Sequence, residues 1–269
     1  ILMKQNQYLL AISEFNTVLG LPNFKKFINE IDIHYHLARL YSETKNYIKE
    51  IDEYRAILTF NPEDLTANHR IGHALYKKKE YKKAREHLTK AISIDPNLND
   101  VYLPLGISCY NISDYEKGEE YLIKALRSSG ENSDAHYYLG CIYQMKKEYT
   151  AAIDMFNKAK HDRKHFLKAL YQIGEIYFHL EEYDNAVEVL EQGLVNLKDK
   201  GDESNEYRYL LAECYEHQNK IKEAYHHWSK IAEDNPAFRG TRIKLESYEG
   251  ILGNRSEEHT SELQSRQSI

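Results

Sequence analysis

Apolar residues along this chain recur at the spacing of amphipathic helices, and the helices recur as pairs. In one stretch Leu37, Ala38 and Tyr41 fall on a single helical face, and in the next stretch Tyr54 and Ile57 do the same. Short polar or proline-containing breaks separate the stretches, and proline cannot continue a helix. The pattern therefore predicts an all-α chain built from short two-helix units.

The two-helix unit repeats every 34 residues. The tyrosines in register are Tyr47, Tyr81, Tyr115, Tyr149 and Tyr183. The glycines in register are Gly72, Gly106, Gly140 and Gly174, and the small residues of the second helix are Ala84, Gly118, Ala152 and Ala186. Tyrosine makes up only 23 of 269 residues, so five in register by chance are improbable. A period of this length indicates a solenoid, in which each repeat packs on its neighbours.

The small residues have a packing reason, because we expect the glycine of the first helix and the alanine of the second to lie where the two helices come closest. A larger side chain there would separate the helices or strain rotamers. Glu50 departs from this pattern in the first complete repeat.

The repeat carries the signature of a known family. The tetratricopeptide pattern reads W-x2-L-G-x2-Y, then A-x3-F, then P. Residues 133–166 match it at Leu139-Gly140, Tyr143, Ala152 and Phe156. Residues 65–98 match at Ile71-Gly72, Leu75, Ala84, Leu88, Ala91 and Pro96, and residues 167–200 match at Ile173-Gly174, Tyr177, Ala186 and Leu190. The chain thus resembles a tetratricopeptide repeat protein, which implies a right-handed superhelical solenoid of antiparallel helix pairs.

This register predicts the organisation of the whole chain. The expected segments are the second helix of a truncated repeat at 1–24, six repeats at 31–64, 65–98, 99–132, 133–166, 167–200 and 205–238, a capping helix at 239–252, and a disordered tail at 253–269. Within the tail, RSEEHTSELQS resembles a translated sequencing adapter, so we expect it to be artefactual and inert. The lone Trp228 replaces the usual Phe and should be buried.

Composition narrows the function classes. The formal net charge of −6 predicts no basic field for nucleic acid, and no apolar run approaches a membrane span. The three cysteines lie within helical patterns and are expected to be small buried hydrophobes. This usage favours the cytoplasm, although a chain that opens within a repeat leaves localisation open, because a signal or anchor could precede Ile1.

The resemblance implies that partners bind the concave wall, which first helices form at their fifth, ninth and twelfth positions. The expected partner-binding residues are Tyr35, Arg39, His69, His73, Tyr76, Leu103, Tyr110, Tyr137, Tyr171, Glu175, Phe178, Tyr209 and Glu213. Rigidly held aromatic residues anchor many interfaces, so the partner should be a protein or peptide. Glu175, Glu213 and Glu216 suggest a partner with basic character. The alternative is that these tyrosines only pack between neighbouring helices.

Some members of the family hold a peptide's C-terminal carboxylate with Lys, Asn and Arg across three first helices. The fifth positions here offer no Lys and the ninth positions no Asn. We therefore expect this chain not to use that clamp.

Metal binding and catalysis have little support in the sequence. His69 and His73 lie one helical turn apart, but a metal site needs further ligands, and His36 and Asp32 are the nearest candidates. His161 and His165 share the spacing and are expected to be solvated. No phosphate loop, HExxH or GxSxG occurs, so we expect no enzyme and no cofactor.

The predicted function is therefore a protein-interaction scaffold. The alternative is a structural spacer of a larger protein whose catalytic or membrane part is missing from this sequence. A third hypothesis, of a different class, is a metal-dependent activity at His69 and His73.

Overall fold

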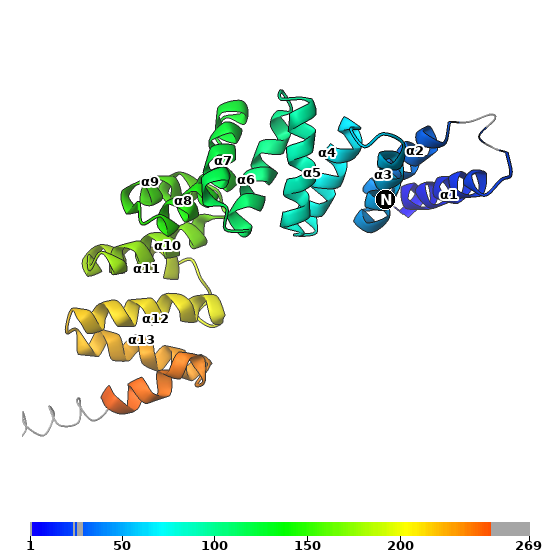
Figure 1. The fold of residues 1–269 in the computed structure, drawn as a ribbon. Helices are drawn as coiled ribbons and strands as arrows, with labels where there is room; N and C mark the ends of the chain where they lie inside the picture. The colour runs from blue at the N-terminus through cyan, green and yellow to red at the C-terminus, as the bar shows by residue number, and fades with distance from the viewer. Residues whose placement is uncertain (1, 24, 26–28, 249–269) are drawn as a thin grey trace, which may run out of the picture. The chain divides into compact units, whose positions relative to one another are not determined.

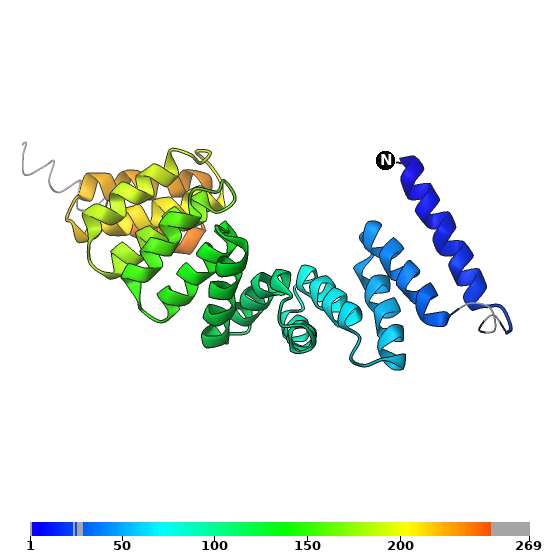
Figure 2. The ribbon, with the colours of Figure 1, turned by 90° about the horizontal axis from the view of Figure 1, so that it is seen from above.

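The computed structural model describes residues 2–23, 25 and 29–248, and within these ranges it contains helices and turns but no strand. Successive helices lie side by side as antiparallel pairs (Figures 1 and 2). The all-α solenoid expected from the 34-residue register is confirmed. The chain forms two compact units, residues 1–142 and 143–269, and the division falls within helix α8 (Ser133–Met145).

The N-terminal unit is a chain of sequential helix contacts. Its elements before α8 are α1 (Leu2–Leu19), α2 (Glu30–Glu43), α3 (Tyr47–Phe60), α4 (Leu65–Lys77), α5 (Tyr81–Ile94), the 3-10 turn η2 (Asn99–Val101), α6 (Tyr102–Asn111) and α7 (Tyr115–Ser129). From α1 to α7, each helix packs on the next one along the chain. Local pairing of this kind is what the short repeat predicts.

The C-terminal unit repeats the arrangement. Its helices are α9 (Tyr149–Ala159), α10 (Phe166–His179), α11 (Tyr183–Leu194), α12 (Asp202–His217) and α13 (Ile221–Asp234), followed by the 3-10 turn η3 (Phe238–Gly240) and a helical stretch at 241–248. Trp228 is fully buried, as predicted. Ile243 in that helical stretch is 75% exposed. Residues 249–252 of the predicted cap and the tail at 253–269 lie outside the described residues.

The tyrosines of the 34-residue register each begin a second helix: α3, α5, α7, α9 and α11 all start with one. Two residues before each start, and before α13, the backbone is left-handed, with φ between 56° and 63°. These residues are Lys45, Lys79, Ser113, Lys147, Glu181 and Asn219. In the first such turn, Asn46 N–H donates to the carbonyl of Tyr41 at 2.8 Å, and Lys45 N–H donates to that of Ser42. Each first helix thus ends in a Schellman motif built on a residue other than glycine.

The glycines of the first helices sit beneath leucines of the second. A Cβ added at Gly72 would lie 2.5 Å from Leu88 Cγ, and Gly106 and Gly174 face Leu122 and Leu190 in the same way. From the sequence we expected the alanine position of the second helix, rather than the leucine, to lie opposite the glycine of the first helix. That position is also close, because a Cβ on Gly118 would lie 3.4 Å from the carbonyl oxygen of Gly106. Both positions therefore limit how large a side chain the hairpin accepts.

Glu50 is buried where the other repeats carry Ala or Gly, and only 4% of it is exposed. Burial raises the pKa of its carboxyl, while a hydrogen bond from Ser42 and the nearby charges of Lys77 and Arg70 lower it. The same helix also buries Ile51, Tyr54 and Ile57. The hairpin of α2 and α3 therefore buries a carboxyl group at a position where the other repeats carry Ala or Gly.

The three cysteines, Cys109, Cys141 and Cys214, are free and buried, as predicted. Burial raises the pKa values of Cys109 and Cys141 to about 11 and that of Cys214 to about 12. Such thiols stay protonated and act as small apolar residues. None of the described helices is long and apolar enough to cross a membrane.

Candidate interaction surface

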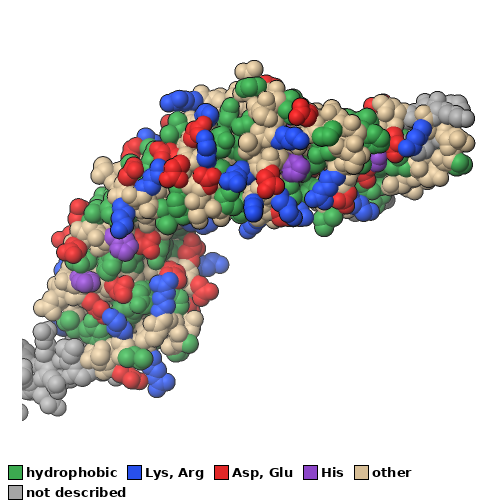
Figure 3. Space-filling model, in the orientation of Figure 1, with side chains coloured by type: hydrophobic (Ala, Val, Ile, Leu, Met, Phe, Trp, Pro, Cys, Tyr) green, Lys and Arg blue, Asp and Glu red, His purple; other side chains and the backbone are tan. Residues whose placement is uncertain are grey.

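The predicted partner-binding residues are accessible in part. Arg39 is exposed, the others are half-buried, and none of the set is fully buried. Those from Tyr35 to Tyr137 lie in the N-terminal unit, and those from Tyr171 to Glu213 lie in the C-terminal unit. Acidic and basic side chains alternate over the face in Figure 3, with no large patch of one sign among the residues coloured there.

Tyr35 links one repeat to the next. Its hydroxyl donates to Asp64 Oδ1 at 2.6 Å, and the same carboxylate oxygen caps α4 by accepting from the N–H of Ala67 at 2.8 Å. The ring meets that of Tyr54 edge to face at 6.2 Å. Burial, together with the Asp64 hydrogen bond, raises the pKa of Tyr35. The hydroxyl of Tyr35 is therefore already engaged within its own chain, while its half-buried ring remains partly accessible.

A hollow of about 510 Å³ lies beside Tyr35, and we refer to it as the N-terminal hollow. Its lining residues are Tyr35, His36, Arg39, Ser42, Glu43, Tyr54, Thr66 and Arg70. A second hollow of about 280 Å³ adjoins it towards α1 and shares His36, Arg39 and Glu43 with it. Among the described residues, neither Arg39 nor Arg70 has a carboxylate at salt-bridge distance. Two guanidinium groups thus face a concave surface with their hydrogen-bond donors available.

The central tyrosines form a packed cluster. The ring of Tyr138 contacts those of Tyr110 at 5.2 Å and Tyr137 at 5.5 Å, in both cases edge to face. The hydroxyls of Tyr110 and Tyr137 are hydrogen-bonded to Cys141, and burial raises the pKa values of both tyrosines. For these two residues, the geometry favours packing between neighbouring helices.

His69 and His73 meet a residue that sequence reasoning did not name. Their Nε2 atoms lie 2.9 Å and 3.8 Å from Asp100 Oδ2, on the turn η2. The expected neighbour His36 instead stacks on Phe15 at 5.3 Å, and neither it nor Asp32 joins the group. That expectation was wrong because His36 faces α1, whereas the histidines of α4 face the following repeat. The expectation that His165 is solvated was also wrong, because this residue at the start of α10 is only 4% exposed.

In the C-terminal unit the predicted aromatic residues contact the segment after α13. The ring of Tyr209 meets Trp228 edge to face at 4.9 Å, and the Arg239 guanidinium lies 5.1 Å from the centroid of Tyr209. Arg239 also pairs with Glu206 at 2.7 Å. Tyr171 packs on Tyr207, with the ring centroids 5.4 Å apart. These tyrosines are therefore partly covered by their own chain.

Glu216 is fully engaged by its own chain. It accepts from Trp228 Nε1 at 2.9 Å and from Lys244 Nζ at 2.7 Å. Glu175 accepts from Gln144 and Gln172, and Glu213 is hydrogen-bonded to Tyr209. Because Lys244 neutralises Glu216, the acidic end of the predicted wall is less acidic than the sequence suggests.

The antiparallel helix pairs define the class of protein as a helical-repeat solenoid. Two tetratricopeptide repeat models match residues 31–64 and 67–98, and a model described as anaphase-promoting complex, cyclosome, subunit 3 matches residues 124–193. No curated protein matches the sequence. On this evidence and that of the fold, the chain belongs to the tetratricopeptide repeat family.

Solved structures share this fold. The C-terminal part of a TPR repeat-containing protein from Cytophaga hutchinsonii is 21% identical, with a TM-score of 0.65 over 91% of this chain and 96% of that one. YrrB, described as a TPR protein with an unusual peptide-binding site, is 18% identical, with a TM-score of 0.59 over 72% of this chain and 97% of its own. MamA is 24% identical, with a TM-score of 0.56 over 64% of this chain and 92% of its own.

Proposed function

We propose that this scaffold binds an extended peptide segment of a protein partner in the N-terminal hollow, with Arg39 and Arg70 as its polar anchors. The observation that carries the proposal is that Arg39 and Arg70, which form no salt bridge within the described part of the chain, both line a hollow of about 510 Å³. Arg39 occupies a position predicted from the repeat register. Arg70 lies one residue beyond the predicted His69, in the next first helix.

The chemistry of the hollow favours a segment rich in hydrogen-bond acceptors. A guanidinium presents several N–H groups in a fixed plane and binds carboxylates or backbone carbonyls in pairs. The half-buried ring of Tyr35 supplies apolar area beside them, at little cost in side-chain entropy. The adjoining hollow adds Phe15 and Tyr8. A segment with an acidic or carbonyl-rich stretch next to an apolar residue would complement these groups.

The fold supports binding of this kind. Solenoids bind partners along surfaces that successive repeats build together, and Arg39 of α2 and Arg70 of α4 line the same hollow although they hold different positions in their repeats. The structural relative YrrB is described as a TPR protein with an unusual peptide-binding site. At 18% identity that likeness concerns the fold alone.

The C-terminal unit is still predicted to prefer partners of basic character. It now rests on Glu175 and Glu213, because Glu216 is neutralised by Lys244. Such a preference would show as an affinity that falls steeply with added salt.

The test is a peptide-array screen followed by affinity measurements on the peptides that bind. Replacing both arginines in Arg39→Gln/Arg70→Gln should weaken binding by about 1–3 kcal/mol for each anchor that is a hot spot. The matched control is Arg55→Gln, which removes the same charge from α3, where Arg55 contacts Asp52 at 3.4 Å outside the hollow. Circular dichroism verifies the fold of each variant.

A folded double variant that keeps the wild-type affinity for every peptide would refute the hollow as the binding site. Absence of any peptide ligand, with the wild type folded, would favour the alternative of a structural spacer.

A further inference from the structure

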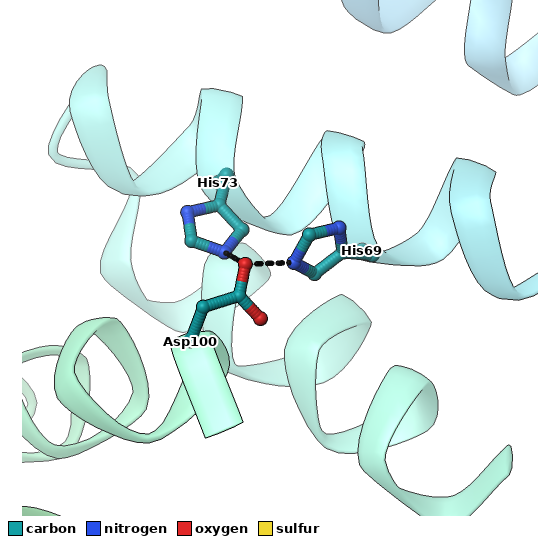
Figure 4. A group of neighbouring side chains, drawn as sticks. All are labelled: His69, His73 and Asp100. Atoms are coloured by element: carbon teal, nitrogen blue, oxygen red, sulfur yellow. Dashed lines mark hydrogen bonds and ion pairs between the residues drawn. The ribbon is translucent and has the colours of Figure 1, made fainter. Parts of the chain in front are cut away.

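Three side chains from two neighbouring repeats converge at one point on the N-terminal unit. Figure 4 shows His69 and His73 extending from α4 towards Asp100. Both histidines present Nε2 to the same oxygen, Asp100 Oδ2, at 2.9 Å and 3.8 Å. All three candidate ligand atoms lie within 4.8 Å of one another. The spacing of four residues places both imidazoles on one face of the helix.

The group contains an unsatisfied nitrogen. His73 Nε2 is buried and has no hydrogen-bond partner among the described residues. A buried polar atom without a partner costs free energy, so such an atom needs an explanation. An imidazole nitrogen without a hydrogen-bond partner can present the lone pair that a metal ion requires.

We propose that His69, His73 and Asp100 bind a divalent transition-metal ion of the zinc class. Two imidazoles and a carboxylate are a common three-ligand set for Zn²⁺, with water or a partner group in the fourth position. Imidazole ligands disfavour Mg²⁺ and Ca²⁺, which prefer oxygen.

The geometry needs only a small adjustment to hold the ion. Ligand atoms about 2.0–2.2 Å from a tetrahedral Zn²⁺ lie roughly 3.4 Å from one another. The His69–Asp100 distance of 2.9 Å would lengthen and the His73–Asp100 distance of 3.8 Å would shorten. Asp100 can make both changes by rotating its side chain, which is 60% exposed.

The surrounding charges limit the affinity. Asp100 supplies the negative charge of the group, while Arg70 and Lys77 are close enough to disfavour positive charge on His73. An open three-ligand site in this setting should bind more weakly than a closed four-ligand structural site. A bound ion would connect α4 to the turn η2, and so stabilise the junction of two repeats.

The decisive experiment titrates the chelator-treated, dialysed chain of 269 residues with Co²⁺ and then Zn²⁺. Tetrahedral Co²⁺ gives a visible absorption band, and Zn²⁺ should displace it at one ion per chain; calorimetry gives the affinity. The variants His73→Gln and Asp100→Asn should each lose at least about tenfold in affinity, as removal of a ligand or of its support typically does. Zn²⁺ should raise the thermal midpoint of the wild type but not that of either variant.

The matched control is His161→Gln, at an exposed histidine with the same four-residue spacing to His165. It should bind the ion as the wild type does. Asp100→Asn changes an exposed side chain, so its fold should survive and circular dichroism can verify this. Failure of the wild type to bind one ion would overturn the proposal, and so would unchanged affinity in both variants.

Discussion

Gly72 of α4 lies so close to Leu88 of α5 that the hairpin leaves no room for a side chain on Gly72. A Cβ on Gly72 would be 2.5 Å from Leu88 Cγ and 3.1 Å from the backbone nitrogen of Leu88. Both residues are fully buried, so neither can move into solvent. The glycine is therefore a packing requirement of the repeat rather than a source of flexibility.

Gly72→Ala should lower the free energy of unfolding by about 1–3 kcal/mol. The added methyl group forces the Leu88 side chain off its rotamer or separates α4 from α5. This loss outweighs the gain of up to about 1 kcal/mol that alanine normally brings to a helix interior. Urea unfolding followed by far-ultraviolet circular dichroism measures the difference.

Gly118→Ala provides the control, because the same substitution should be neutral or stabilising by about 0.5 kcal/mol. Its Cβ would meet the flexible end of Ile142 at 3.0 Å. Alanine fills the equivalent position in the repeats with Ala84, Ala152 and Ala186. Equal losses from Gly72→Ala and Gly118→Ala would contradict the assigned contacts.

Glu50→Ala should stabilise the N-terminal unit by about 1 kcal/mol at pH 8. The wild type buries a carboxylate that has only partial compensation from Ser42, Lys77 and Arg70, and removing poorly compensated buried charge often stabilises a protein. Because the folded pKa of Glu50 is raised, the cost of ionisation is complete above that pKa. It disappears as the pH falls below the unfolded value of 4.5.

The advantage of Glu50→Ala in urea unfolding should therefore shrink as the pH is lowered towards 4.5. Glu50→Gln keeps the side-chain volume and separates charge from size. A loss of stability in Glu50→Gln at pH 8 would mean that the positive charges of Arg70 and Lys77 overcome the desolvation of Glu50.

The repeat register made most of the fold predictable, since it depends on local contacts. Tyr47 and Tyr81, which are in register in the sequence, hold the same place at the start of successive second helices, and Trp228 is buried as expected. Each of these properties follows from a periodic pattern within one hairpin. The left-handed residues before each second helix were missed, because Lys79 and Glu181 are not the glycine that usually marks such a turn.

The side-chain partners in the candidate sites were much less predictable. Asp100 reaches His69 across 31 positions of sequence, and Lys244 reaches Glu216 across 28. Asp100 lies on a short turn and Lys244 beyond the last repeat, where the 34-residue pattern assigns no side-chain direction. The same limit applies to the hollow beside Arg39, because a hollow depends on the side chains that surround it rather than on one helical face.

The last prediction concerns acid stability and rests on His227. Its side chain is 8% exposed and stacked on Tyr215 at 5.6 Å, and its Nδ1 is buried with no hydrogen-bond partner among the described residues. Burial, with smaller effects from His226 and Arg208, lowers the pKa of His227 to about 4. The unfolded chain takes up a proton as the pH falls below 6.5, whereas the folded chain does so only near pH 4. This difference should remove about 2–4 kcal/mol of stability across that pH window.

His227→Phe keeps a ring against Tyr215 and cannot be protonated, so it should lose less stability than the wild type between pH 6.5 and 4. Trp228 is the only tryptophan in the sequence and lies beside His227 in α13, so its fluorescence during urea unfolding reports on the C-terminal unit. Gly193→Ala is the control, because its Cβ would overlap the buried ring of Tyr207 and should destabilise the unit equally at every pH. If the wild type and His227→Phe lose stability in parallel as the pH falls, protonation of His227 is not the cause.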